Sequence, residues 1–144
     1  MDMATENMKF ANKMNFVSPE PFDLGGEVFR VFSERLAKED MLIWGECLRI
    51  SMRCNCTNIR FNAGDMLAAI GIDDSEEDRE NLEAAFLRLM CTVIEADSGE
   101  NKSRSAFLQS YLINKETGDY DVHLNPGLAA MCCGGMIEGE GDGQ

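Results

Sequence analysis

The chain has 144 residues, 44% of them hydrophobic, which suits one folded domain with its own core rather than a disordered segment. Its net charge of −13 disfavours a surface that binds DNA or an anionic membrane, and it favours basic partners. No apolar run approaches the roughly 20 residues of a membrane span, and the N-terminus lacks a signal-peptide pattern, so we expect a cytoplasmic protein.

The six cysteines do not indicate a disulfide framework or a zinc site. Disulfide frameworks belong to exported proteins, and zinc sites typically use paired Cys-x-x-Cys or Cys/His ligands. Here the closest pairs are Cys54-Asn55-Cys56 and Cys132-Cys133. We therefore predict no metal and no cofactor. We expect Cys47 and Cys91 to be small core residues and Cys132 and Cys133 to be exposed thiols.

The first part of the chain predicts an arm, a strand and a long helix. Residues 1–26 contain prolines and glycines that interrupt regular structure, so we expect an irregular arm. Residues 27–36 are rich in β-branched and aromatic residues and indicate a strand, although apolar residues every four positions would also suit a helix. Residues 39–53 predict a helix with acids at its start, arginines at its end and two apolar stripes. The stripes are Met41, Trp44, Leu48 and Met52, and Ile43, Cys47 and Ile50.

A short strand and a capped helix are predicted next. The strand covers residues 58–61. Asn62 then stands where its side chain can accept a backbone N–H, which predicts a helix over residues 63–70. Gly71 supplies the glycine that commonly ends a helix.

A long amphipathic helix is predicted over residues 76–91, after a turn. Ser75, three residues before Asp78, resembles a capping box with Asp in place of Glu. The residues expected to be buried are Leu82, Ala85, Phe86 and Leu89. The opposite face carries Glu76, Glu80, Glu83 and Leu87.

The rest of the chain predicts strands and a short helix. Residues 92–97 indicate a strand, followed by a polar loop over residues 98–105. Residues 107–114 and 120–124 are two β runs joined by a short turn, which predicts a β-hairpin. A short helix is expected over residues 128–133.

This order of elements is that of an α+β winged-helix domain, in which a helix-turn-helix precedes a C-terminal β-hairpin wing. We therefore divide the chain into an irregular N-terminal arm (1–26), a winged-helix domain (27–133) and a flexible acidic, glycine-rich tail (134–144).

Several stretches also carry a family resemblance. They are Asp40-Met41-Leu42-Ile43-Trp44, Ile59-Arg60-Phe61-Asn62, Asp65-Met66-Leu67, Ile70-Gly71, Leu82 to Leu89 with Thr92, Leu108 to Ile113, Gly118, Val122-His123-Leu124 and Leu128. Over residues 28–136 the chain resembles the first winged-helix domain of TrfA-type plasmid replication initiators. The resemblance consists of a pattern of apolar positions with a few identities.

The resemblance implies a role in plasmid replication. Initiators of that family bind repeated origin sequences, melt the origin, and recruit the helicase and sliding clamp. Their first winged-helix domain serves dimerisation and touches DNA. This chain departs from the family in having room for only one such domain, and in carrying Asp74-Ser75-Glu76-Glu77-Asp78 where the family has Gly, Arg and aromatic residues. The sequence leaves open a homodimer that forms through the predicted helix containing Trp44 or through the strands.

The charge of the helix-turn-helix argues against ordinary docking on duplex DNA. Between residues 61 and 100 the only bases are Arg79 and Arg88. The acids there are Asp65, Asp73, Asp74, Glu76, Glu77, Asp78, Glu80, Glu83, Glu95, Asp97 and Glu100. Because Lys and Arg on the contacting surface supply most non-specific affinity for phosphates, DNA binding through this segment is disfavoured.

The acidic helix is instead a candidate protein-binding face. The predicted contact residues are Glu76, Glu77, Glu80, Glu83 and Leu87. We expect a non-enzymatic protein of a mobile element that acts in replication initiation or its regulation, mainly through protein contacts. The alternative is a DNA-mimicking inhibitor, anti-CRISPR or anti-restriction, whose carboxylates complement a basic nucleic-acid-binding defence complex. A solvated acidic face without a partner is the third interpretation.

Lys102 and Arg104 are the candidate nucleic-acid contacts of the wing. They lie in the predicted polar loop before the hairpin, and a wing commonly lies over the DNA backbone. Further basic residues cluster between Arg30 and Arg60. Solvated surface charges are the alternative interpretation of both groups.

No pattern of catalytic residues appears. The single histidine, His123, alternates with Val122 and Leu124 on a predicted strand, which suits a surface residue. It has no Ser/Asp or Cys partner in triad order, and no glycine loop followed by Lys suggests phosphate binding. We therefore predict that the protein is not an enzyme.

Overall fold

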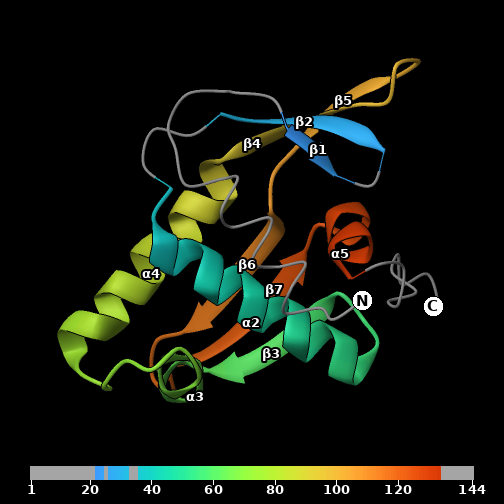
Figure 1. Cartoon of the computed structure of the whole chain (residues 1–144). Coiled ribbons are helices and arrows are strands. Elements are labelled where there is room, and N and C mark those ends of the chain that lie inside the picture. Colours follow the sequence, from blue (N-terminus) through green and yellow to red (C-terminus); the bar gives the residue numbers. More distant parts are fainter. Residues whose placement is uncertain (1–21, 25, 33–35, 134–144) are drawn as a thin grey trace.

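The computed structural model describes residues 22–24, 26–32 and 36–133 (Figure 1). This part of the chain is a mixed α+β fold with four helices and two small antiparallel sheets. The helices are α2 (Lys38–Cys54), α3 (Ala63–Ala69), α4 (Glu76–Cys91) and α5 (Pro126–Cys132). None of them combines the length and hydrophobicity that crossing a bilayer requires. The predictions for residues 1–21 and for the tail lie outside the described residues.

The long helices form where the sequence predicts. α2 extends one residue beyond the predicted range at each end, and the Asp40 carboxylate accepts the Ala37 backbone N–H at its start, at 2.9 Å. α4 has the predicted bounds, and the Ser75 hydroxyl oxygen accepts the Asp78 N–H at 3.0 Å. The predicted core residues of α4 are all buried, namely Leu82, Ala85, Phe86 and Leu89.

The caps of α3 also follow the prediction. The Asn62 side chain accepts the Gly64 N–H at 2.9 Å. At the other end Gly71 has a φ of +81° and donates its N–H to Ala68, while Ile72 donates to Leu67. This pair of bonds is the Schellman pattern, which places a left-handed residue just after the helix.

A four-stranded sheet has the order β1-β2-β4-β5. Its strands are β1 (Phe22–Leu24), β2 (Glu27–Phe32), β4 (Val93–Asp97) and β5 (Lys102–Ser105). In β2 the buried side chains alternate, so the strand predicted over residues 27–36 is confirmed for residues 27–32 over its helical alternative. The predictions of an irregular arm and of a polar loop were wrong where those segments form β1 and β5. β1 is only three residues long and β5 (Lys-Ser-Arg-Ser) has no apolar residue, so backbone pairing with β2 and β4 defines them.

A three-stranded sheet has the order β3-β7-β6. Its strands are β3 (Asn58–Asn62), β6 (Leu108–Asn114) and β7 (Asp119–Leu124). The predicted hairpin is confirmed as β6–β7, and β3 pairs with the other edge of β7. In this register Asn62 lies opposite Asp119, which places the start of α3 beside the hairpin turn. Figure 1 shows the four-stranded sheet at the top of the view and the three-stranded sheet in its lower half, where α2 overlaps it.

Aromatic side chains join the helices to the three-stranded sheet. Trp44 of α2 packs edge-on against Phe107, with ring centroids 5.0 Å apart. Tyr120 of β7 lies 5.1 Å from both Phe61 of β3 and Phe86 of α4. Burying an aromatic ring of this kind stabilises the fold by roughly 1.5–3 kcal/mol, so the contact between Tyr120 and Phe86 holds α4 against the sheet.

The cysteine predictions hold in part. Cys47 is buried in α2, as predicted. Cys91 is exposed and Cys132 and Cys133 are buried, so those three predictions were wrong. Cys91 follows Leu87 by one helical turn on the solvent side of α4, whereas Cys132 follows the buried Leu128 on the inner side of α5.

Candidate partner-binding surface

The acidic side chains predicted to bind a partner share the solvent-facing side of α4. Glu76, Glu80, Glu83 and Leu87 follow a spacing of four, three and four residues, which places them in one row. All four are exposed, and Leu87 is 56% accessible. Glu77 is also exposed, beside the row. None of these glutamates takes part in an ion pair within the described part of the chain.

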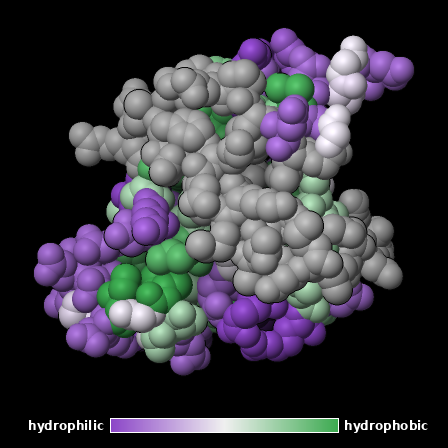
Figure 2. Space-filling model, in the orientation of Figure 1, coloured by the Kyte–Doolittle hydropathy of each residue, from purple (hydrophilic) through white to green (hydrophobic). Residues whose placement is uncertain are grey.

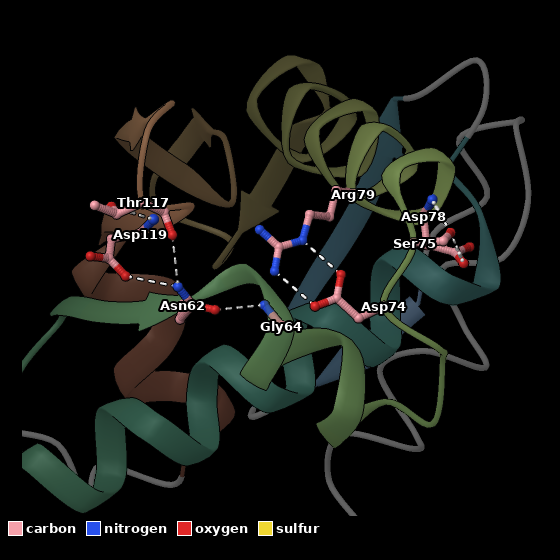
Figure 3. Close-up of polar contacts among 8 residues, drawn as sticks. All are labelled: Asn62, Gly64, Asp74, Ser75, Asp78, Arg79, Thr117 and Asp119. Atoms are coloured by element: carbon pink, nitrogen blue, oxygen red, sulfur yellow. Dashed lines mark hydrogen bonds and ion pairs between the residues drawn. The ribbon is translucent and has the colours of Figure 1, made fainter.

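Arg79, the first of the two arginines of α4, is engaged by a neighbouring acid. Its Nε and Nη2 donate to the two carboxylate oxygens of Asp74 at 2.7 and 2.8 Å (Figure 3). The hydrogen bond from Arg79 lowers the pKa of Asp74, and the same bond raises the pKa of Arg79. A bidentate pair of this kind holds the guanidinium in one orientation.

The Arg79 guanidinium also lies close against two glycines. A Cβ on Gly118, in the hairpin turn, would stand 2.7 Å from Arg79 Nη1. A Cβ on Gly64 would stand 2.9 Å from Asp74 Oδ2 and 3.3 Å from Arg79 Nη2. Figure 3 shows Asn62 beside this pair, between the hairpin turn and the start of α3. The Asn62 amide donates to Thr117 O at 3.1 Å and to Asp119 Oδ1 at 3.0 Å.

Arg88, the second arginine of α4, pairs with an acid of α2. Its Nε and Nη2 donate to the carboxylate of Asp40 at 2.7 and 2.8 Å. Asp40 is 0% accessible, and the hydrogen bond that Arg88 donates to it raises the pKa of Arg88. The pair therefore links α4 to the first turn of α2. Both arginines of α4 thus serve internal contacts, and the outward face of this helix is left negative.

An apolar hollow of about 310 Å³ lies on the side of α4 that faces α2 and α3, away from the acidic row. Its apolar lining comes from α2, α3, α4 and the turn after α3, namely Ile43, Leu67, Ile70, Ile72, Leu82 and Ala85. Glu39 and Asp78 stand among the polar lining residues. In Figure 2 a green patch lies within purple surface at the lower left, where Figure 1 places α3 and the start of α4. The surface thus offers apolar contact beside carboxylates.

Lys102 and Arg104 are not on the wing. Both lie on β5 of the four-stranded sheet, whereas the predicted wing is the β6–β7 hairpin of the other sheet. The placement was wrong because the residues before the hairpin pair back onto β4 instead of extending the hairpin. Their contact with nucleic acid stays a prediction, but Arg104 donates to Glu95 at 3.0 Å and is already paired.

Three further arginines of the described chain are also paired. Arg30 lies 3.5 Å from Glu95, Arg49 pairs with Glu46, and Arg60 lies 3.2 Å from Asp121. Within the cluster predicted between Arg30 and Arg60, these three arginines are therefore matched by acids. The turn of the hairpin itself carries an exposed Lys115, which the sequence analysis did not single out.

The groups considered for catalysis or metal binding are not assembled into a site. His123 is exposed on β7, with Nε2 3.9 Å from Asp121 Oδ1. Among the described residues no group of three or more His, Cys, Asp or Glu side chains could hold a metal ion. Trp44, whose helix the sequence leaves open as a dimer contact, is 1% accessible and packs inward. The exposed apolar residue of that helix is Leu42, at 47%.

The fold matches solved structures, while no family model and no curated protein sequence matches the chain. A crystal structure of domains 2–3 of RctB (RctB-155-483) matches with a TM-score of 0.62 at 13% identity, over 79% of this chain and 52% of that one. A second, of selenomethionine derivatives of RctB domains 2 and 3, matches with a TM-score of 0.57 at 13% identity, over 76% and 52%. The chain thus spans about half the length of these structures. RctB is a replication initiator, so the likeness shows a fold found in an initiator; it does not extend to the TrfA family.

Proposed function

We propose that this chain is a winged-helix protein that acts in replication initiation or its regulation, through protein contacts and without catalysis. In this proposal α3 and α4 form the helix-turn-helix and the β6–β7 hairpin forms the wing. The fold shared with RctB supports a replication setting. The resemblance to TrfA-type initiators favours a mobile element, and it rests on the sequence pattern alone.

One observation carries the choice of protein over DNA as the partner. The arginines of α4 are bound to Asp74 and Asp40, while its outer carboxylates have no partner among the described residues. A helix that reads DNA needs free cations to neutralise phosphates, and α4 presents the opposite charge. The matching partner presents Lys or Arg to the acidic row and an apolar side chain to Leu87, which continues that row.

The test is a pull-down from bacterial lysate, with and without nuclease, read by mass spectrometry. The tagged full chain is compared with a Glu76→Lys/Glu80→Lys variant. We expect the original chain to retain a helicase, sliding clamp or initiator after nuclease treatment. The variant is expected to lose that protein, because its acidic row is reversed.

A matched variant separates the α4 surface from total charge. Asp23→Lys/Glu100→Lys makes the same change in net charge at two exposed positions, one on β1 and one in the turn between β4 and β5. It is expected to retain the partner, and circular dichroism checks that both variants fold. Retention of the same partners by the α4 variant would refute the proposal.

The second candidate function is a DNA-mimicking inhibitor of a host defence complex. It is favoured by the unpaired carboxylates of Glu76, Glu80 and Glu83, which stand about 6 and 4.5 Å apart along the helix axis. Such a protein would capture a basic nucleic-acid-binding complex that survives nuclease and is released by added DNA. Capture of replication proteins that added DNA does not displace would exclude this candidate.

A further inference from the structure

Two cysteine thiols lie together where α2 ends. In a helix, side chains two positions apart point in different directions. Here α2 ends at Cys54, and Asn55 takes a left-handed conformation with a φ of +55°. The chain therefore turns back, and the Sγ atoms of Cys54 and Cys56 lie 3.2 Å apart.

The backbone around the two thiols is held by hydrogen bonds. The Cys56 N–H donates to Ser51 O at 3.2 Å, and the Ser51 hydroxyl donates to Cys56 O. A disulfide requires the sulfur atoms to approach to about 2.05 Å. Side-chain rotation supplies the remaining distance of about 1 Å, so the helix and the following strand can stay in place.

These thiols can also be reached from solvent. Cys54 is exposed and Cys56 is half-buried, whereas Cys47, Cys132 and Cys133 are buried. We infer that Cys54 and Cys56 form a reversible dithiol–disulfide couple, which closes by exchange with a low-molecular-weight disulfide such as glutathione disulfide. This modification site is independent of the α4 surface and of the proposed function.

The exchange proceeds in two balanced steps. The thiolate of one cysteine attacks a sulfur of glutathione disulfide, forming a mixed disulfide and releasing one glutathione thiolate. The second cysteine, as thiolate, then attacks the protein sulfur of that mixed disulfide. This forms the Cys54–Cys56 bond and releases the second glutathione. Two protein thiols are oxidised, one glutathione disulfide is reduced, and the two thiol protons pass to the released thiolates.

The surroundings of the pair indicate slow exchange rather than rapid turnover. Burial, followed by the hydrogen bond with Cys56, raises the pKa of the Cys54 thiol. Because the thiolate is the attacking form, a raised pKa slows the first step. Once the mixed disulfide has formed, the neighbouring sulfur at 3.2 Å is the nearest attacking group on this segment.

Peptide mapping tests the inference. The full chain carrying Cys91→Ser is incubated with glutathione disulfide, quenched in acid, alkylated and digested with trypsin. Cleavage after Arg53 and Arg60 releases a peptide that holds Cys54 and Cys56 and no other cysteine. We expect this peptide to be lighter than the dithiol by two hydrogen atoms, to resist alkylation, and to regain both alkylation sites after dithiothreitol.

Single substitutions provide the matched controls. In Cys54→Ser or Cys56→Ser, with Cys91→Ser retained, the remaining thiol is expected to keep its glutathione as a stable adduct. The protein with both thiols should show little of that adduct. The inference is overturned if that protein accumulates the adduct as the single variants do, or if both of its thiols remain open to alkylation under conditions in which the single variants form the adduct.

Discussion

Glu95 is a nearly buried carboxylate between two arginines on neighbouring strands. It lies opposite Arg30 of β2 and Arg104 of β5 in the sheet register, with Nη1 of Arg30 at 3.5 Å and Nε of Arg104 at 3.0 Å. Burial raises the pKa of Glu95, but the hydrogen bond from Arg104 and the charges of Lys102 and Arg104 outweigh it, so the pKa is lowered overall. This row of charges crosses three strands and stabilises the folded form.

The lowered pKa of Glu95 predicts a loss of stability in acid. Its folded pKa lies below the ordinary value of 4.5, so the contribution is present above pH 4.5 and is lost as the pH falls through the folded pKa. We expect the stability difference between the original chain and Glu95→Gln to shrink as the pH drops from about 6 to about 3. Urea unfolding at a series of pH values measures this. A difference that stays constant with pH would contradict the assignment.

Asp40 combines two roles in one buried side chain. It accepts hydrogen bonds from Nε and Nη2 of Arg88, and it caps α2 by accepting one from the Ala37 N–H. We expect Asp40→Ala to lower the free energy of unfolding by about 3 kcal/mol, because it leaves Arg88 and the helix start without partners. Asp40→Asn keeps an acceptor for the cap and is expected to lose about half as much. Denaturant unfolding compares the variants, and a loss below about 1 kcal/mol for Asp40→Ala would contradict this account.

At the scale of elements, the contacts of Arg79 position α3, α4 and the hairpin turn. Gly118 allows the guanidinium to approach the turn, and its carbonyl accepts the Ala63 N–H at 2.8 Å where α3 begins. Asn62 bonds the same turn from the end of β3. The arginine that would face DNA in a basic recognition helix is therefore part of the scaffold here.

Gly118→Ala tests how tightly this junction is packed. Gly118 has a φ of +79° and an added Cβ would meet Arg79, whereas Gly71 has a φ of +81° and open space around it. We expect Gly71→Ala to cost about 1 kcal/mol, from backbone strain alone, and Gly118→Ala to cost about 2–3 kcal/mol. Thermal and urea unfolding measure both. The extra cost of Gly118→Ala over Gly71→Ala should shrink in an Arg79→Ala background. Equal costs for the two glycines would show that the contact with Arg79 is loose.

At the scale of the whole molecule, charge sets which partners can approach. A net charge of −13 repels phosphate backbones, and pairing removes most of the cations that could offset it locally. We expect no binding of labelled duplex DNA at about 0.15 M salt, measured by fluorescence anisotropy. Lys102→Glu/Arg104→Glu should leave that result unchanged. Binding that weakens steeply with salt and disappears in this variant would instead establish β5 as a DNA contact.

Much of the fold and part of the candidate surface were predictable from local signals. The bounds and buried side of α4 follow from the Ser75 cap and the spacing of Leu82, Ala85, Phe86 and Leu89. The acidic row follows from the same periodicity. The pairing of Arg79 with Asp74, five residues apart, could have been suspected from the sequence. The pairing of Arg88 with Asp40 could not, because 48 residues separate them.

The sequence by itself determined α2, α3 and α4, the caps of α3 and α4, the β6–β7 hairpin and the acidic face of α4, because each depends on residues close together in the chain. It also predicted the last helix, but two residues too late at its start, at 128 instead of Pro126. Only the tertiary structure decided that β1 and β5 are strands, that Lys102 and Arg104 leave the wing, and that Cys132 and Cys133 are buried. β1 and β5 have only three and four residues, too few for a periodic pattern to mark them as strands. Burial depends on what packs against a residue. For the same reason the structure alone revealed that both arginines of α4 are already bound.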